Sequence, residues 1–246
     1  MNIELLKNLC ETPGIAGSEE KVRDLILNEI KDLACEHTID PMGNLIVHCS
    51  GTGPKVELLC HMDEIGFIVN YINDDGFIHV QPLGGFDARN LFSRRVLVCT
   101  DNGNYKGVMN PAGLPVHLAK PEDRKNVPNP DEFMIDIGMG KDTKDVIQIG
   151  DYVVMDEPFL ELGKHRVVSK ALDNRIACWL GIEALRNYEG NADLYPRMAP
   201  TCEWDTAAAH AIVEGAGGSV SDNKGKSLVY GKKNILNPFF VVRGFS

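Results

Sequence analysis

Apolar side chains recur at three- and four-residue spacing through the first 30 residues, which is typical of amphipathic helices. The turn Thr12-Pro13-Gly14 interrupts this pattern, so it predicts two helices between Ile3 and Asp32. Ser18 precedes two glutamates and is the predicted hydroxyl cap of the second helix. The apolar positions are Leu5, Leu6, Leu9, Val22, Leu25, Ile26 and Ile30.

Strand-length apolar runs follow the helices. Leu45–Val47 and Val56–Cys60 are bounded by glycine and proline, as buried strands often are. From Gly66 to about Val154 the pattern changes to short alternating strands separated by Gly, Asn and Asp turns, which indicates an inserted β-rich domain. Helical spacing returns between Asp173 and Asn187. This succession of helices and buried strands predicts the α/β class.

The last part of the chain also contains helical and strand patterns, but in shorter segments. We expect a helix from Thr206 to Glu214, then a Gly-rich turn, and a final strand at Phe239–Val242. With 246 residues, of which 43% are hydrophobic and 24% charged, the composition is that of a globular protein with a sizeable core.

Charge and hydropathy narrow the classes of partner. The 35 acidic and 25 basic residues give a net charge of -10, and the sequence has no Lys/Arg cluster, which argues against binding to duplex nucleic acid. No apolar run approaches the roughly 18 residues that span a bilayer, and residues 1–10 do not resemble a signal peptide. We therefore expect a cytoplasmic protein without a membrane partner.

The 7 cysteines show no C-x-x-C spacing, which predicts reduced thiols rather than a disulfide framework or a zinc knuckle. Cys60 and Cys178 lie in apolar runs and are predicted core residues.

The first candidate for chemistry is His61-Met62-Asp63-Glu64, which follows the predicted strand Val56–Cys60. Ligands gather at the carboxyl ends of strands in open α/β sheets. A histidine two residues from an aspartate suits a metal site, because one can bind the ion while the other orients the imidazole. An ordinary surface loop is the alternative for such a short motif.

The second candidate is Asp173, which stands between the apolar run Val167-Val168 and a predicted amphipathic helix. A helix N-cap would account for this residue by itself. The functional alternative is a carboxylate that bridges two metal ions, because neighbouring cations need shared anionic ligands.

Taken in order, these segments resemble the dinuclear-metal aminopeptidases, a family that includes the glutamyl and TET-type enzymes. The resemblance covers residues 1 to about 187. It depends on Thr12-Pro13-Gly14 with Ser18-Glu19, on Asp40-x-x-Gly43-Asn44-Leu45, on His61–Phe67, and on Ala171–Arg175.

The resemblance implies roles for three residues. His61 would be the ligand of one metal, Asp63 its orienting carboxylate in the catalytic site, and Asp173 the bridge. The metals would be zinc or cobalt, two per site in the complete family, and the reaction would release N-terminal residues from peptides. Residues that bind the substrate cannot be assigned.

The same resemblance implies a domain plan. Residues 1–66 and 155–187 would form part of an aminopeptidase-type α/β sheet domain. Residues 67–154 would form an inserted β-rich, barrel-like domain, used in that family for assembly into homo-oligomers.

The sequence departs from that family after the helix at Asp173. The family has an adjacent Glu pair there, which supplies the base and a ligand, and then a further Asp and a distant His. No adjacent Glu pair follows Asp173, and the last histidine is His210, within an alanine-rich helix where a helix-face residue is expected. The resemblance therefore implies an impaired or inactive aminopeptidase.

Residues from about 189 to 246 resemble a different family, the inositol-monophosphatase superfamily, and most closely its 3'(2'),5'-bisphosphate nucleotidase branch. By this resemblance Asp205 would be a magnesium ligand, and Gly190–Arg197 would lie near the substrate. Read alone, Trp204-Asp205-Thr206 is an acidic helix start. The segments that carry the resemblance are Gly190–Arg197, Pro200–Ala208, Ala211–Gly218 and Asn237–Val242.

The phosphatase pattern is also incomplete. Its metal cluster has an upstream Glu and a D-P-x-D-G-T motif, whereas the nearest sequence here, Asp74-Asp75-Gly76, lacks the Pro and Thr and reads as a hairpin turn. The sequence thus predicts a chimera, in which residues 188–246 are an α/β phosphatase-derived tail.

Three functions remain open from the sequence: a metallo-aminopeptidase, a magnesium-dependent phosphatase, and a catalytically dead fusion. A hybrid site is a further alternative, in which Glu203, Asp205 or His210 fills positions beside His61 and Asp173. If the two parts do not dock, apolar faces of the Asp173 helix would stay exposed and the protein would be marginally stable.

Overall fold

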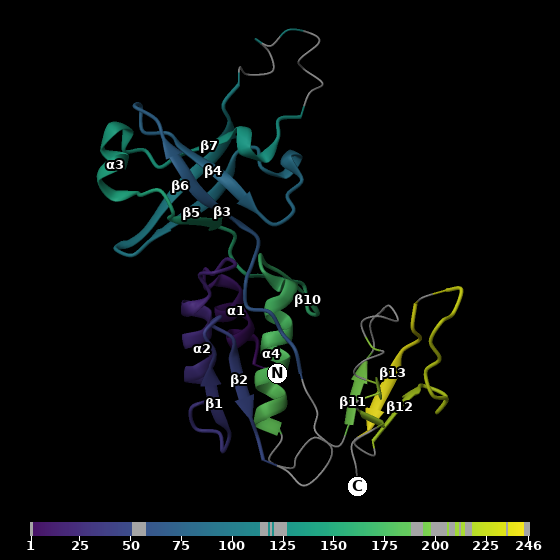
Figure 1. Ribbon diagram of the computed structural model, residues 1–246. Coiled ribbons are helices and arrows are strands. Elements are labelled where there is room, and N and C mark those ends of the chain that lie inside the picture. Colours follow the sequence, from purple (N-terminus) through teal and green to yellow (C-terminus); the bar gives the residue numbers. More distant parts are fainter. Residues whose placement is uncertain are drawn as a thin grey trace. The chain divides into compact units, whose positions relative to one another are not determined.

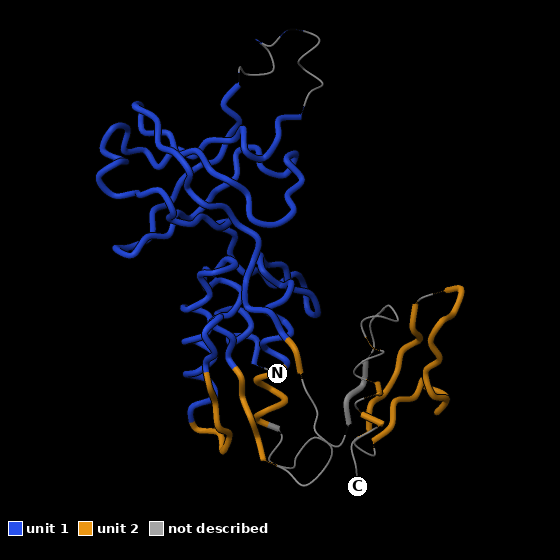
Figure 2. The backbone as a smooth tube through the Cα atoms, viewed as in Figure 1, with its two compact units in different colours: residues 1–31, 39–45, 60–180 blue, residues 32–38, 46–59, 181–246 orange. Residues whose placement is uncertain are grey.

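The structure is a computed structural model, and the chain falls into two compact units (Figures 1 and 2). Unit 1 comprises residues 1–31, 39–45 and 60–180, and unit 2 comprises residues 32–38, 46–59 and 181–246. The structure describes residues 2–50, 58–113, 118, 120, 127–187, 194–197, 206, 210–211, 213–214, 218–234 and 236–243.

Unit 1 begins with the two predicted helices, which the structure confirms. Helix α1 spans Ile3–Glu11 and begins at Asn2, whose side chain accepts a hydrogen bond from the Leu5 amide at 3.1 Å. Helix α2 spans Glu20–Ile30. Each helix buries its apolar stripe, and the buried residues are Leu5, Leu6, Leu9, Cys10, Val22, Ile26 and Ile30.

The start of α2 differs from the sequence-based expectation. Its N-cap is Glu19, without a side-chain capping bond, so the prediction that Ser18 caps this helix is wrong. The Glu19 carboxylate instead accepts a hydrogen bond from the Gly17 amide at 2.9 Å. This bond stabilises the turn before the helix rather than the first helical turn.

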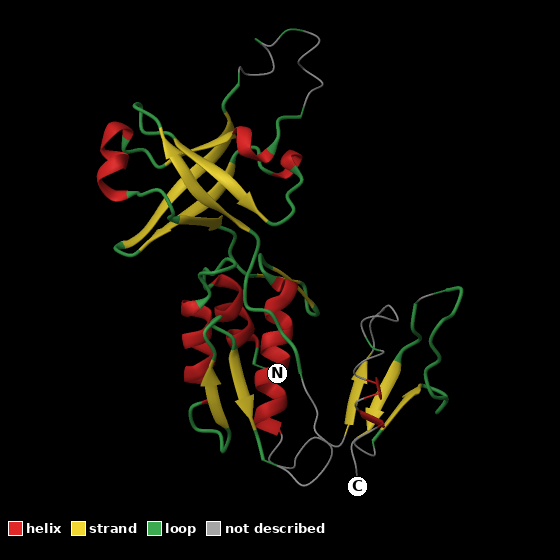
Figure 3. Ribbon diagram, in the orientation of Figure 1, coloured by secondary structure: helices red, strands yellow, loops and turns green. Residues whose placement is uncertain are grey.

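Six antiparallel strands of unit 1 close into a barrel in the order β3-β4-β7-β6-β5-β8 (Figure 3). Short helical turns join some of them, including α3 at Thr143–Val146. The strands are β3 Gly66–Ile72, β4 Ile78–Leu83, β5 Arg94–Thr100, β6 Gly103–Pro111, β7 Phe133–Asp136 and β8 Tyr152–Met155. Closure leaves no unpaired sheet edge.

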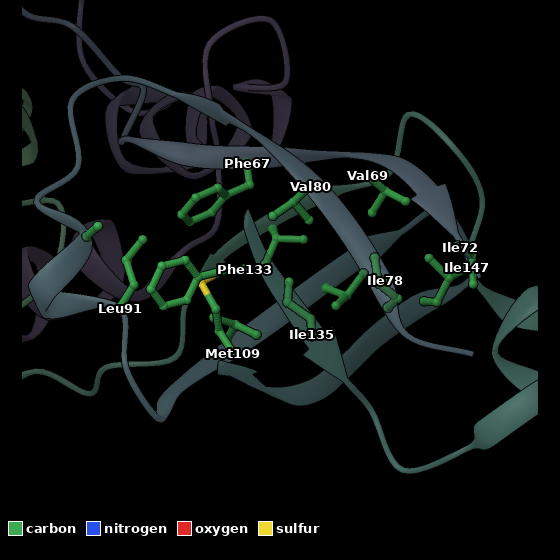
Figure 4. Packing of buried hydrophobic residues seen from close by; sticks show 14 residues of the cluster. Phe67, Val69, Ile72, Ile78, Val80, Leu91, Met109, Phe133, Ile135 and Ile147 are labelled. Atoms are coloured by element: carbon green, nitrogen blue, oxygen red, sulfur yellow. The ribbon is translucent and has the colours of Figure 1, made fainter. Parts of the chain in front are cut away.

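The barrel interior is the main hydrophobic core, and alternate strand residues point into it (Figure 4). Phe133 is fully buried and meets Phe92 edge to face at 5.3 Å between ring centroids. Burying each such side chain contributes about 1.5–3 kcal/mol. The fully buried members of the cluster are Phe67, Val69, Ile78, Val80, Val96, Val98, Met109, Phe133, Ile135 and Val153.

After the barrel the chain forms a hairpin and a long helix. Strands β9, Leu160–Leu162, and β10, Arg166–Val168, pair antiparallel. Helix α4 spans Leu172–Asn187, but the backbone at Asp173 and Asn174 is not helical, so the regular helix starts after them. Its residues Ile176 and Leu180 are 42% and 39% exposed.

The remaining sheets are small. Strands β1, Glu36–Ile39, and β2, Leu45–His48, form a two-stranded sheet. In unit 2, β11 Leu194–Arg197, β13 Phe240–Arg243 and β12 Ser219–Asp222 form an antiparallel sheet in that order. Here Val220, Leu228 and Phe240 pack together in a small buried cluster.

Two expectations from the sequence are corrected. Leu58–Cys60 forms no strand and is exposed, since an apolar run becomes a strand only where a neighbour completes its hydrogen bonds. The other residues of that predicted strand lie outside the described part. Cys35 and Cys49 form a disulfide, so the prediction of reduced thiols is wrong for this pair.

The mixture of helices and sheets agrees with the expected α/β class. The division into a sheet domain at 1–66 and 155–187, an insertion at 67–154 and a phosphatase-derived tail stays a prediction. Within the described part of the chain, no helix combines the length and apolar character of a membrane span.

Replacing Gly76 with alanine should destabilise the barrel more than replacing Gly150. Both glycines have positive φ, +89° and +99°, so alanine is strained at either position. Only at Gly76 would the new Cβ overlap a backbone, that of Gly140, because nothing lies within 4 Å of it at Gly150. We expect Gly76→Ala to lower the free energy of unfolding by about 1–3 kcal/mol more than Gly150→Ala in urea denaturation. Equal losses would contradict the clash.

Candidate metal site

The three residues implied by the aminopeptidase resemblance, His61, Asp63 and Asp173, lie together in unit 1. The Nδ1 atom of His61 is 3.0 Å from Oδ1 of Asp63, and its Nε2 atom is 3.2 Å from Oδ1 of Asp173. The side chains are 52%, 37% and 97% exposed, respectively. The imidazole therefore lies between two carboxylates at the protein surface.

This arrangement restricts the imidazole chemically. A neutral ring that donates from Nδ1 to Asp63 presents the lone pair of Nε2 to Asp173, and two acceptors then face each other. The contact is favourable only if Nε2 carries a proton or if a cation lies between Nε2 and the carboxylate.

A shared divalent cation fits the observed spacing. Two donors at ordinary bonding distance from one tetrahedral zinc ion lie about 3.3 Å apart, close to the 3.2 Å between His61 and Asp173. Asp63 contacts the other ring nitrogen, as an orienting carboxylate does. Within the described residues no group of three His, Cys, Asp or Glu side chains is placed to hold a metal.

The chain brings Asp173 to His61 at the point where α4 begins. The non-helical backbone at Asp173 and Asn174 delays the regular helix. The Asp173 carboxylate points to a ring 112 residues away in sequence. Its observed contact is therefore with His61, the other candidate ligand.

A buried ionic cluster lies next to these residues and was not predicted from the sequence. Oε1 of Glu64 is 2.6 Å from Nζ of Lys170 and 3.9 Å from a guanidinium nitrogen of Arg175. The exposed fractions of these side chains are 4%, 9% and 0%. The sequence did offer one indication of a buried charge: Arg175 stands directly before the apolar stretch of α4.

Arg175 also connects the cluster to the loop after α1. Its guanidinium donates to the carbonyl of Leu9, to that of Thr12 at 3.0 Å and to that of Gly14 at 3.2 Å. The Glu64 amide donates to the Gly14 carbonyl at 2.9 Å. The bond to Leu9 satisfies a carbonyl in the last turn of α1, which the helix end leaves without an intrahelical partner, and the bonds to Thr12 and Gly14 fix the loop that follows.

Burial dominates the electrostatics of the cluster. It raises the pKa of Glu64 above its ordinary value, although Lys170 and Arg175 both favour the charged carboxylate. Burial also lowers the pKa of Arg175. Two cations thus offset only part of the cost of burying this carboxylate.

Two thiols lie beside the histidine. The Cys60 sulfur is 3.2 Å from the Ala177 carbonyl, and the Cys178 sulfur is 3.3 Å from the His61 carbonyl. A hydrogen bond from Cys178, with a smaller effect of His61, lowers the pKa of Cys60 to about 7. Cys178 is buried as predicted, but Cys60 is exposed, so its assignment to the core is wrong.

Other candidates from the sequence are not part of this cluster. Asp205 and Glu203 lie outside the described residues. His210, in unit 2, is buried, with Nδ1 2.8 Å from the Tyr230 hydroxyl and Nε2 3.0 Å from the Glu214 carboxylate. The Asp74-Asp75-Gly76 segment forms the predicted turn, between β3 and β4.

Comparison with known proteins identifies the family. Residues 43–214 match the M42 glutamyl aminopeptidase family, and the chain belongs to this family. The match continues past the end expected near Asn187. The chain spans about half the length of the curated aminopeptidase relatives that it matches, for example 53% of one from Escherichia coli and 57% of one from Pyrococcus furiosus.

Individual relatives agree with this assignment. The chain is 35% identical to the lysyl aminopeptidase of Pyrococcus furiosus over 198 residues, which are 78% of this chain and 57% of the relative. The TET1 peptidase of Pyrococcus horikoshii aligns with a TM-score of 0.69 and 32% identity, over 76% of this chain and 56% of that one. That peptidase can assemble into a tetrahedron or a large octahedral shell.

A separate, short similarity involves 55 residues. Over this length the chain is 54% identical to the 3'(2'),5'-bisphosphate nucleotidase CysQ of Salmonella typhimurium, which covers 22% of each protein. This is a similarity of sequence over 55 residues, and it does not establish their fold.

Cys60 should react with iodoacetamide near neutral pH. Because the thiolate is the nucleophile and the pKa is lowered to about 7, the alkylation rate should rise with pH and reach half its maximum near pH 7. Cys178→Ala removes the hydrogen bond and should move the midpoint upward. Mass spectrometry of the Cys60 peptide measures both rates. The same midpoint in the two proteins would contradict the assigned cause.

Proposed function

We propose that this protein is a divalent-metal-dependent hydrolase of the aminopeptidase type, acting on the free N-termini of peptides. The observation that carries the proposal is the position of His61 between Asp63 and Asp173. Membership of the M42 family supports the reaction class. Relatives named for lysyl and glutamyl substrates leave the preferred side chain open.

Zinc or cobalt is the proposed cofactor. His61 would bind it through Nε2 and Asp173 through its carboxylate, and Asp63 would hold the ring through Nδ1. The bound metal would polarise the scissile carbonyl and activate water. Asp63 has a positioning role, because it contacts the ring nitrogen that faces away from Asp173.

Peptide hydrolysis by the isolated chain is proposed to be impaired. No adjacent Glu pair follows Asp173 in the sequence, so the base and ligand that the family resemblance implies have no counterpart. Among the described residues no third donor completes the site. A metal held by two protein donors binds weakly and is poorly oriented.

We further propose that copies of the chain associate through the outer face of the barrel, as cytoplasmic homo-oligomers without nucleic acid. Exposed apolar side chains on the barrel strands support this proposal, among them Tyr71 on β3 at 53% and Val108 on β6 at 42%. The assembly known for the TET1 peptidase supports it as well.

Metal binding should depend on the two proposed ligands. In calorimetric titrations with Zn²⁺ or Co²⁺, binding should disappear in His61→Ala and in Asp173→Asn. It should weaken by about 10- to 100-fold in Asp63→Asn, because the imidazole loses its orienting partner. His165→Ala, which removes an exposed histidine from the β9–β10 turn, should bind as the wild type does.

The same proteins should then be assayed for release of the N-terminal residue from a short peptide. The proposal expects slow, metal-dependent release that is absent in His61→Ala. Metal binding without any release would favour the catalytically dead alternative. Wild-type affinity in His61→Ala would contradict the proposed site.

The short similarity to the bisphosphate nucleotidase supports a second candidate, a magnesium-dependent phosphatase activity with Asp205 as a ligand. We expect the wild type to release no more phosphate from a nucleoside 3',5'-bisphosphate than the Asp205→Asn variant does, because the sequence has no D-P-x-D-G-T motif. Magnesium-dependent release by the wild type that Asp205→Asn abolishes would overturn this expectation and favour the second candidate.

A further inference from the structure

One buried carboxylate connects the segments that carry the candidate ligands. Glu64 directly follows Asp63, whereas Lys170 and Arg175 stand on either side of Asp173 in sequence. The Glu64 carboxylate is 2.6 Å from Nζ of Lys170 and 3.9 Å from the Arg175 guanidinium. The two segments therefore meet at a single anion.

This contact matters because Asp173 is not held by packing. Its side chain is 97% exposed, so the neighbouring backbone must fix its position. The backbone there is non-helical, and α4 does not constrain it. Lys170 and Arg175 are almost fully buried and restrict the chain before and after Asp173.

The roles of Arg175 and Glu64 can be separated. Arg175 donates to the carbonyls of Leu9, Thr12 and Gly14, so its removal would disturb the loop after α1. Glu64 contacts the same loop through its backbone amide, a hydrogen bond that glutamine at this position would retain. A neutral side chain of the same size at position 64 would thus lose the ionic contacts but retain the backbone hydrogen bond to the loop.

We propose that Glu64 is a positioning residue, which holds Asp173 opposite His61 through its ionic contacts with Lys170 and Arg175. The inference rests on the proposed function, because the purpose of that placement is to let the two side chains share a metal ion. Glu64 touches neither the metal nor the substrate in this role.

The first test needs no metal. In ¹⁵N NMR spectra, the ring-nitrogen signals of His61, assigned with His61→Ala, should shift when Asp173→Asn is introduced into the wild type. In a Glu64→Gln background the same substitution should shift them much less, because Asp173 no longer faces the ring. An unchanged shift in the Glu64→Gln background would overturn the proposal.

The second test measures Co²⁺ affinity and the visible spectrum of the bound ion. Glu64→Gln should weaken binding by about 10- to 100-fold, as expected when a supporting contact is lost. Glu157→Gln is the matched control, since it removes a carboxylate 3.0 Å from Arg94, outside the candidate site. Wild-type affinity and spectrum in Glu64→Gln would contradict positioning.

A third variant covers the case in which Glu64→Gln fails to fold. Lys170→Met breaks the shorter contact and leaves Glu64 facing Arg175, and it should reduce the ring-nitrogen shift in the same way. If Asp173→Asn shifts the His61 ring-nitrogen signals but the wild type binds no Co²⁺, the proposed function fails while the positioning role stands. If the wild type binds Co²⁺ and Asp173→Asn causes the same shift in the Glu64→Gln background, only the positioning role fails.

Discussion

Burying the Glu64 carboxylate away from water is costly, and two cations, Lys170 and Arg175, offset part of that cost. Both cations come from one segment, and Arg175 extends the contact to three carbonyls near the end of α1. Segments far apart in sequence are thereby joined at one point. The exposed pair His61 and Asp173 lies beside that point and depends on it for a defined geometry.

The barrel is stabilised by a different interaction. Its strands close on themselves and bury alternate apolar side chains, so its core is independent of the ionic cluster. A smaller group connects the two parts, in which Ile15 packs with Cys99 and Val154. The loop that ends at Ile15 therefore contacts the barrel and, through Gly14, also Arg175.

The spacing of apolar and polar residues predicted the helices, the strands and one short-range contact, because these depend on neighbouring residues in the sequence. The helices α1 and α2 and the barrel strands follow from periodicity, and the His61–Asp63 contact follows from a spacing of two residues. The pairing of Asp173 with His61 came from a family resemblance, because no local signal joins residues 112 apart.

Contacts that depend on the whole fold were missed. The Glu64–Lys170 ion pair spans 106 residues, and the disulfide joins cysteines 14 apart without a recognisable motif. Leu58–Cys60 was predicted as strand from its apolarity, yet a strand also needs a hydrogen-bonded neighbour, which a local pattern does not supply. Cys60 belongs to the same apolar run, so it was expected in the core, but it is exposed.

The central claim is that His61 and Asp173 share a divalent cation whose place is fixed by the buried ionic cluster. Anomalous diffraction at the zinc edge from crystals grown with zinc tests it most directly. The account predicts a peak within bonding distance of Nε2 of His61 and the Asp173 carboxylate, with Asp63 on the far side of the ring. Zinc bound at other residues, with His61 and Asp173 in direct contact and no peak between them, would contradict it.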